Sequence, residues 1–180
     1  MMRFDHVGLS VADLDAMTSW WCAALGLEVE FDFALEAVDL RGAMLLGPDG
    51  WRLELLHRVG NAAGLQAANP AEAALTRGYG HLALDVPDVD AAYADLLAAG
   101  ASDRMTPRPS PEPGVRMAFV ADPEGNLVEL LDRTTSREGG FETVASATSS
   151  TTDSAPVVEE GALAPVSKPP TGVAPVGEPS

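Results

Sequence analysis

The feature that most constrains this chain is an internal repeat with an offset of 75 residues. A gap-free shift by this distance aligns the block 6–24 with 81–99 and, separately, the block 43–58 with 118–133. The identities include histidine and aspartate in the first block and glycine and glutamate in the second, as well as the common alanine and leucine. Because one offset holds in two separated blocks, the sequence predicts two copies of a single structural unit.

Hydrophobic periodicity defines the order of elements in the first copy. Residues 4–11 alternate between apolar and polar side chains, as a half-buried strand does. Asp13 is then placed to cap a helix with apolar residues at helical spacing, and Gly26 follows as a C-terminal stop. The predicted elements of the first copy are a strand over 4–11, a helix over 14–25 and strands over 28–34, 38–47 and 51–57, the last two joined by a turn at 48–50.

The second copy repeats this plan. Its predicted strand spans 79–86, its helix 88–99 with Gly100 as the stop, and its final hairpin 115–121 and 127–132. We therefore predict an α+β fold of two tandem βαβββ modules, 1–58 and 78–133, related by pseudo-twofold symmetry and forming a cupped mixed sheet around one site. Residues 59–77 are the expected connector, with a short helix from Pro70 to Leu75.

The composition changes near residue 134. Residues 134–180 are rich in Ser, Thr, Pro, Ala, Gly and Glu and contain a single aromatic residue, Phe141. Such a segment has too little apolar surface to offset the entropy lost on ordering. We expect one folded domain over 1–133 and a disordered acidic tail over 134–180.

The charge balance narrows the range of partners. The net charge is -16, with 11 Lys and Arg against 27 Asp and Glu, which argues against nucleic acid or an anionic membrane as a partner. The N-terminal residues lack the pattern of a secretory signal, and no apolar run is long enough to span a membrane, so the expected location is the cytoplasm. Cys22 is the only cysteine, and we expect a buried, inert thiol.

Two His–Glu pairs recur in equivalent places and carry the predicted chemistry. His6 and Glu54 are 48 residues apart, and so are His81 and Glu129. Strand parity places all four on the sheet faces that helix packing does not use. A single histidine on such a face is usually a solvated or hydrogen-bonded residue, but two symmetric His–Glu pairs favour a metal site. Two imidazoles and two carboxylates would bind one divalent ion, Zn, Ni, Co, Mn or Fe, with water or substrate completing the coordination.

Other polar and aromatic residues have plainer interpretations. His57 falls on the opposite strand face from Glu54, so we expect a structural or exposed role. The aspartates near the two helix starts suit capping and the helix dipole rather than catalysis. These are Asp13, Asp15, Asp88 and Asp90. The helix aromatics Trp20, Trp21 and Tyr93 are expected in the core or at an interface.

Four segments resemble the vicinal oxygen chelate superfamily, which contains glyoxalase I, methylmalonyl-CoA epimerase, extradiol dioxygenases and bleomycin and fosfomycin resistance proteins. They are DHVGLSVADLDAMTSWWCAALGL, WRLELL, GHLALDVPDVDAAYADLLAAGA and AFVADPEGNLVELLD, spread over 3–133. The resemblance implies paired βαβββ modules, a homodimer and a metal held by the first and last strands of each module. The matching positions are His6, Glu54, His81 and Glu129, and all four agree with glyoxalase I.

At several positions this sequence differs from the pattern of individual members of the superfamily, and these differences bear on the substrate. Bacterial glutathione-dependent glyoxalase I has Arg and Asn where this chain has Ser10 and Arg58, which favours a different thiol or carbonyl substrate. The epimerase usually has Gln in place of Glu54 and a second His in place of Gly80. Extradiol dioxygenases and fosfomycin transferases use only three protein ligands, so a fourth carboxylate favours proton transfer over oxygen activation.

The resemblance therefore implies a metal-dependent, glyoxalase I-like lyase or isomerase that transfers a proton next to a carbonyl. Its small chelating substrate would be a hemithioacetal or an acyl thioester. Glu129 is the first candidate for the base and Glu54 the second, and Glu36, expected on the strand nearby, is an outside candidate. The alternatives are a drug- or metabolite-sequestering protein of the bleomycin-resistance type and an extradiol dioxygenase. Arginines that could contact a substrate anion are Arg41, Arg52, Arg58, Arg108 and Arg116.

Overall fold

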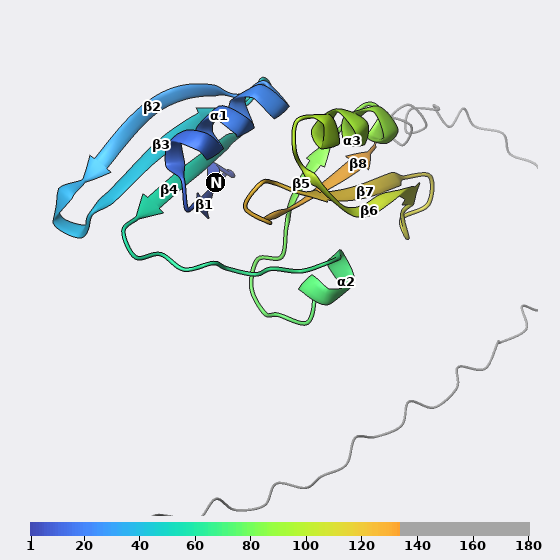
Figure 1. Cartoon of the computed structure of the whole chain (residues 1–180). Coiled ribbons are helices and arrows are strands. Elements are labelled where there is room, and N and C mark those ends of the chain that lie inside the picture. The colour runs from blue at the N-terminus through green and yellow to red at the C-terminus, as the bar shows by residue number, and fades with distance from the viewer. Residues whose placement is uncertain (134–180) are drawn as a thin grey trace, which may run out of the picture. The chain divides into compact units, whose positions relative to one another are not determined.

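A computed structural model describes residues 1–133, and the predicted tail at 134–180 lies outside these residues. Figure 1 shows two modules in succession, the first blue to cyan and the second green to orange. Module 1 contains β1 (His6–Ser10), α1 (Leu14–Leu25), β2 (Glu28–Leu35), the 3-10 helix η1 (Glu36–Val38), β3 (Leu40–Leu46) and β4 (Arg52–Arg58). The connector contains α2 (Pro70–Ala73). Module 2 contains β5 (Leu82–Asp85), α3 (Val89–Ala98), β6 (Ser102–Pro109), β7 (Arg116–Ala121) and β8 (Leu127–Asp132).

Each module forms its own four-stranded mixed sheet. The strand orders are β1-β4-β3-β2 and β5-β8-β7-β6, which are the same order in the two copies. The first strand of each module pairs in parallel with the last, and the remaining pairings are antiparallel. The crossover that a parallel pair needs is supplied by the module's helix and its next two strands. The predicted tandem βαβββ architecture is confirmed.

The two helices begin in the same way and end differently. Asp13 accepts a hydrogen bond from the Ala16 amide at 3.0 Å, and Asp88 accepts one from the Ala91 amide at the same distance. Both are the N-caps predicted from the sequence. Helix α1 ends at Gly26, whose φ of 65° is left-handed, as a C-terminal glycine allows. Helix α3 ends one residue earlier relative to its own glycine.

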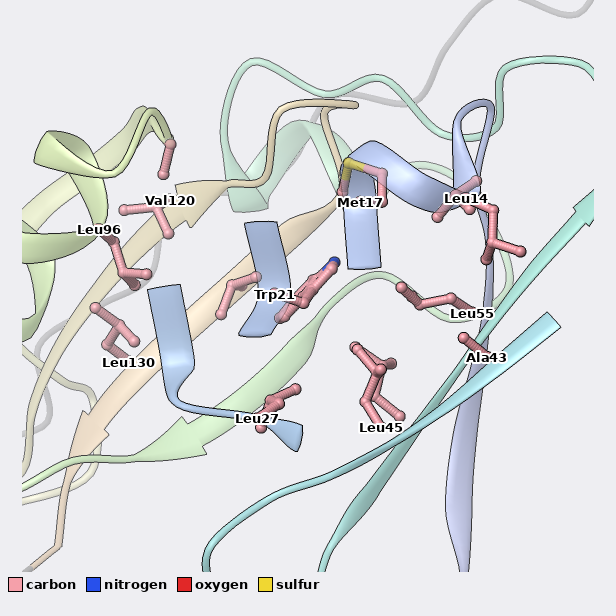
Figure 2. Close-up of a cluster of buried hydrophobic side chains, with 14 of the residues drawn as sticks. Leu14, Met17, Trp21, Leu27, Ala43, Leu45, Leu55, Leu96, Val120 and Leu130 are labelled. Carbon is pink, nitrogen blue, oxygen red and sulfur yellow. The ribbon is translucent and has the colours of Figure 1, made fainter. Parts of the chain in front are cut away.

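The helix-side faces of both sheets contribute to one hydrophobic core. Trp21 of α1 is 1% exposed, and Figure 2 shows it between Leu45 and Leu55 of module 1 and Leu96 and Leu130 of module 2. The neighbouring residue Trp20 donates its indole N–H to the carbonyl of Ala99 at 2.9 Å, at the end of α3. The expectation that the helix aromatics lie in the core or at an interface is confirmed for Trp21, which is in the core.

A smaller apolar cluster lies on the other face of the second sheet. It joins Leu127 of β8 and Ala121 of β7 to Ala67 and Ala73 of the connector, with Leu65 packed against them. Leu127 and Glu129 alternate with the core residue Val128, so they share a strand face. The connector therefore covers one end of the face that carries Glu129.

The corresponding face of the first sheet is more open. Phe31 and Leu35 on β2 are 50% and 53% exposed, although apolar. Phe33 lies between them in sequence and covers Gly42, where an added methyl group would come within 2.3 Å of the Phe33 ring. The two modules thus share a backbone plan but expose different surfaces beside their His–Glu pairs.

Some predicted boundaries are wrong by a few residues. Strand β1 starts at His6 and β5 at Leu82, later than expected, and α2 ends at Ala73. Glu36, which we expected on a strand, begins η1, because the chain turns there through Asp39 with a left-handed φ of 50°. No helix within residues 1–133 has the length and apolar character needed to cross a bilayer.

Candidate metal site

The first His–Glu pair lies where β1 runs parallel to β4. His6 is opposite Arg52 and Gly8 is opposite Glu54, so the His6 and Glu54 side chains are diagonal neighbours on one face. His6 Nε2 is 3.6 Å from Glu54 Oε2. Leu53 and Leu55, which flank Glu54, are buried in the core, so strand parity assigns Glu54 to the face that was predicted.

Asp5 orients the first imidazole. Its Oδ1 lies 2.8 Å from His6 Nδ1, and this hydrogen bond from His6 holds the pKa of the Asp5 carboxyl below its usual value. A carboxylate at Nδ1 keeps the proton on that nitrogen, which leaves the Nε2 lone pair available beside Glu54. Carboxylate–histidine pairs of this kind commonly orient metal ligands.

The second pair repeats this geometry where β5 runs parallel to β8. His81 immediately precedes β5, and its Nε2 is 3.1 Å from Glu129 Oε2. The His81 ring meets Phe119 edge to face, with the ring centroids 5.2 Å apart. The side chain of Glu129 is 15% exposed, against 22% for Glu54. The second carboxylate is therefore the more enclosed of the two.

The spacing inside each pair fits a shared metal ion. Two ligand atoms held about 2.1 Å from an ion at angles of roughly 90–110° lie about 3.0–3.4 Å apart. The observed separations of 3.6 and 3.1 Å are close to that range. One imidazole nitrogen and one carboxylate oxygen per pair suit Zn, Ni, Co, Mn or Fe.

The chain brings the four residues together as two pairs, not as one group. Within residues 1–133, no cluster of three or more His, Cys, Asp or Glu side chains is close enough to hold a metal ion. The helix-side faces of the two sheets share the core, while each pair lies on the opposite face of its own sheet. One chain thus presents two half-sites.

The structure also narrows the list of candidate arginines. Arg41 pairs with Asp15 at 3.1 Å, and Arg116 pairs with Asp90. These ion pairs occupy equivalent places in the repeat and tie a central strand to the start of each helix. Arg52 binds Glu30 through two nitrogens, at 2.6 and 2.9 Å. Arg58 and Arg108 are the candidates without an ion pair among residues 1–133.

Two other predicted residues have structural positions. His57 Nδ1 lies 3.2 Å from the carbonyl of Val11, which confirms the expected structural role. Glu36 is exposed on η1 rather than on a strand, and among residues 1–133 no hydrogen bond or ion pair joins it to either His–Glu pair. Asp5 was not predicted from the sequence, although a carboxylate directly before a candidate ligand is a readable signal; its counterpart in the repeat is Gly80, so the repeat did not reveal it.

Comparison with known proteins identifies the family. The profile of the Glyoxalase/Bleomycin resistance protein/Dioxygenase superfamily matches residues 3–130. A probable lactoylglutathione lyase of Vibrio cholerae is 25% identical over 148 residues, which cover 76% of this chain and 95% of that protein. A lactoylglutathione lyase of Arabidopsis thaliana is 27% identical over 134 residues, 73% of this chain but only 44% of the plant protein. This chain therefore spans less than half of that relative's length.

Solved structures show the same fold. A trypanothione-dependent glyoxalase I of Leishmania major superposes with a TM-score of 0.58 and 27% identity, covering 77% of this chain and 92% of the other. Glyoxalase I of Zea mays gives a TM-score of 0.59 at 22% identity, covering 73% of this chain and 44% of the maize protein. With a profile match over most of the chain and the paired modules on which it falls, this protein belongs to the Glyoxalase/Bleomycin resistance protein/Dioxygenase superfamily.

Proposed function

We propose that this protein is a metal-dependent lyase or isomerase of the glyoxalase I type, which moves a proton next to a carbonyl group of a small chelating substrate. The observation that carries the proposal is the pair of matched His–Glu half-sites, with Nε2 to Oε2 distances of 3.6 and 3.1 Å. The relatives named as lactoylglutathione lyases support the same reaction class.

We assign metal binding to all four side chains and proton transfer to one of the two carboxylates. His6, Glu54, His81 and Glu129 would hold a divalent ion, and that ion would supply a Lewis acid next to the substrate oxygens. Glu129 is the proposed base. It is the more enclosed carboxylate, and the ring of Phe119 lies beside its partner His81, so bulk water has less access to it.

The proposed site would need two chains, because no group of three or more candidate ligands comes together within residues 1–133 of one chain. We propose a homodimer with twofold symmetry, in which module 1 of each chain faces module 2 of its partner. Strands β1 and β5 are edge strands of their sheets, so each has one unpaired side next to its half-site. A twofold dimer of this kind would contain two identical sites.

Mixing two inactive variants tests the shared site. One variant, His6→Ala with Glu54→Gln, disables module 1, and the other, His81→Ala with Glu129→Gln, disables module 2. If each site joins two chains, a mixed dimer has one intact site, and an equal mixture refolded together recovers about a quarter of the wild-type activity. If the site lies within one chain, the mixture stays inactive and the dimer proposal is wrong.

The reaction itself is tested by hydrogen exchange. Metal-loaded protein is incubated in D₂O with hemithioacetals of several thiols, with branched acyl thioesters and with catechols, and α-proton exchange is followed by NMR. Several thiols are needed because Ser10 and Arg58 replace residues that recognise glutathione in relatives. We expect exchange with at least one carbonyl substrate.

Three outcomes would contradict the proposal. Oxygen-dependent cleavage of a catechol without exchange would identify a dioxygenase. Tight binding of a bleomycin-type cation by metal-stripped protein, without turnover of any carbonyl compound, would identify a sequestering protein. Failure to take up about one divalent ion per chain would remove the metal site on which the reaction depends.

A further inference from the structure

The two modules carry different side chains at one equivalent position on the sheets that hold the half-sites. In module 1, Phe33 of β2 lies opposite Gly42 of β3, and its ring covers that glycine. In module 2, the residues 75 positions later form the same cross-strand pair, Arg108 of β6 opposite Met117 of β7. The repeat therefore places an aromatic ring at this position in one module and a guanidinium group in the other.

Strand pairing places Arg108 on the sheet face that carries Glu129. Arg108 is opposite Met117 on β7. Two positions along β7, Phe119 is opposite Glu129 of β8. Because alternate residues of a strand share a face, Arg108 and Glu129 lie on the same side of the sheet. The spacing of strands and the rise per residue put their Cα atoms roughly 12 Å apart, which two long side chains can largely span.

The charge of Arg108 is not neutralised by an acidic side chain. Arg108 is exposed, and no carboxylate within residues 1–133 forms an ion pair with it. By contrast, Arg52, Arg116 and Arg133 are each paired with a carboxylate. The chain has 27 Asp and Glu against 11 Lys and Arg, so acidic partners are abundant. An arginine that stays unpaired beside the proposed base is therefore available to an anion from outside the chain.

We propose that Arg108 determines specificity by binding a carboxylate of the substrate. The substrate would then be a carbonyl compound that carries an anionic group a few bonds away from its two chelating oxygens. This inference rests on the function proposed above, because the chelating oxygens need the metal. The planar guanidinium group can pair with a carboxylate through two N–H groups, which favours this anion over a neutral group of the same shape. Phe33 carries no charge, so module 1 does not provide the same contact at the equivalent position.

Two hydroxamates make a matched pair of probes. Glutaric acid monohydroxamate has a chelating head and a terminal carboxylate, whereas its terminal amide has the same head and length but no charge. Full-length protein is loaded with zinc, its metal content is measured by elemental analysis, and each probe is titrated by calorimetry. We expect the carboxylate to bind about five- to twentyfold more tightly than the amide, the effect of one exposed charge-assisted contact. This preference should decrease in high salt, because salt screens the guanidinium charge.

Three variants test whether the preference comes from Arg108. Arg108→Gln removes the charge and should bind the two probes about equally. Arg108→Lys should keep part of the preference, since the charge remains but the two-pronged contact is lost. Arg58→Gln is the matched control, because Arg58 is also exposed and without an ion pair among residues 1–133, and shares a strand face with Glu54. It should keep the full preference. Both arginines are exposed, so these substitutions should leave the fold intact.

Several results would overturn the inference, and they differ from a failure of the proposed function. Equal affinity of zinc-loaded wild-type protein for the two probes would show that the site does not select an anion, although it binds metal. A preference that survives in Arg108→Gln, or that is lost only in Arg58→Gln, would assign the contact to another residue. Binding of neither probe at full metal content would also contradict the inference. Protein that takes up no metal would contradict the proposed function itself, and the inference would fall with it.

Discussion

The two modules differ at the turn that joins their last two strands, although an equivalent backbone hydrogen bond closes that turn in both. The amide of Gly47 donates to the Trp51 carbonyl at 2.9 Å, and the amide of Asp122 donates to the Asn126 carbonyl at the same distance. In module 1 the Trp51 ring packs against Gly47. In module 2 the buried Asp122 carboxylate accepts hydrogen bonds from Asn126 and Glu124. The two copies therefore share the backbone hydrogen bond of this turn but stabilise the turn with different side chains.

The His–Glu pairs show the same kind of divergence. In module 1, Asp5 orients the imidazole, and Gly8 lies opposite Glu54, where a methyl group would come within 3.3 Å of the carboxylate. In module 2, Phe119 packs against the imidazole, and Ala83 lies opposite Glu129. Equivalent candidate ligands thus have different surroundings, and under the proposed function we expect the two modules to have different roles.

The largest expected effect comes from removing one carboxylate at a time. Glu129→Gln should lower the rate of α-proton exchange by about 10²–10⁴-fold, the usual contribution of a positioned general base. Glu54→Gln should lower it less, because we assign Glu54 to metal binding and not to proton removal. Exchange is measured by NMR at saturating metal, with bound metal determined by elemental analysis.

Measuring the bound metal keeps this comparison interpretable. A variant that no longer binds metal would be inactive whether or not the replaced carboxylate is the base. Exchange rates are therefore compared only between samples of equal metal content. Equal losses in the two variants would show that the modules share the chemistry symmetrically. A larger loss of exchange rate in Glu54→Gln would identify Glu54 of module 1, and not Glu129, as the base.

A smaller effect is expected at a contact between the two modules that has no counterpart elsewhere in the repeat. The Glu124 carboxylate accepts hydrogen bonds from the backbone amides of Ala12 and Asp13, at 2.8–3.0 Å, just before α1. The reverse contact would join Asp49 to residues 87 and 88, but Pro87 has no amide hydrogen to donate, and no hydrogen bond joins Asp49 to the Asp88 amide among residues 1–133. Glu124→Ala should therefore lower the free energy of unfolding by about 1–2 kcal/mol, measured by urea denaturation.

Asp49→Ala is the matched control. Asp49 occupies the equivalent turn position, is exposed and accepts no such bond among residues 1–133, so its loss should change stability by less than about 0.5 kcal/mol. Equal effects of the two substitutions would show that Glu124 contributes only as a surface charge, and that the modules are held together by the core alone.

Local sequence patterns were sufficient to predict most of the helices and strands and the faces of the strands, although not η1. The repeat predicted two equivalent sheets, and alternation placed Leu53 and Leu55 inside and Glu54 on the opposite face, as observed. Helix caps depend on residues three apart, so Asp13 and Asp88 could be identified directly. These features are local because strand alternation and helix capping act within a few residues.

The features that could not be predicted depend on distant parts of the chain or on uncommon backbone conformations. Glu124 is more than 100 residues from the amides that it binds, and no periodicity connects them. The left-handed Asp39 that ends η1 is uncommon for a non-glycine residue, so no local pattern indicated that Glu36 would leave the strand. Whether the two half-sites meet depends on how modules pack, and strand parity does not specify that packing.

The smallest expected effect is a pH dependence confined to the module 2 turn. Asp122 is 1% exposed, and burial raises the pKa of its carboxyl above the ordinary value of 3.8, against hydrogen bonds from Asn126 and Glu124 that lower it. The native state therefore binds this proton more tightly than the unfolded chain does. The stability that protonation contributes is complete below the unfolded pKa and is lost as the pH rises through the folded pKa.

Replacing Asp122 with Asn removes this titration and leaves a side chain of similar size. The free energy of unfolding of the wild-type protein, relative to Asp122→Asn, should fall as the pH rises from about 3.5 and become constant above the folded pKa of Asp122. Urea denaturation of both proteins at a series of pH values gives this difference, in which the titration of the other carboxyl groups cancels. The equivalent position in module 1 is Gly47, so Gly47→Ala serves as a control that changes stability through contact with Trp51 but adds no such pH dependence. A difference that rises with pH would show that the hydrogen bonds to the Asp122 carboxylate outweigh its burial, so that this turn, unlike its counterpart, is stabilised by a buried charge.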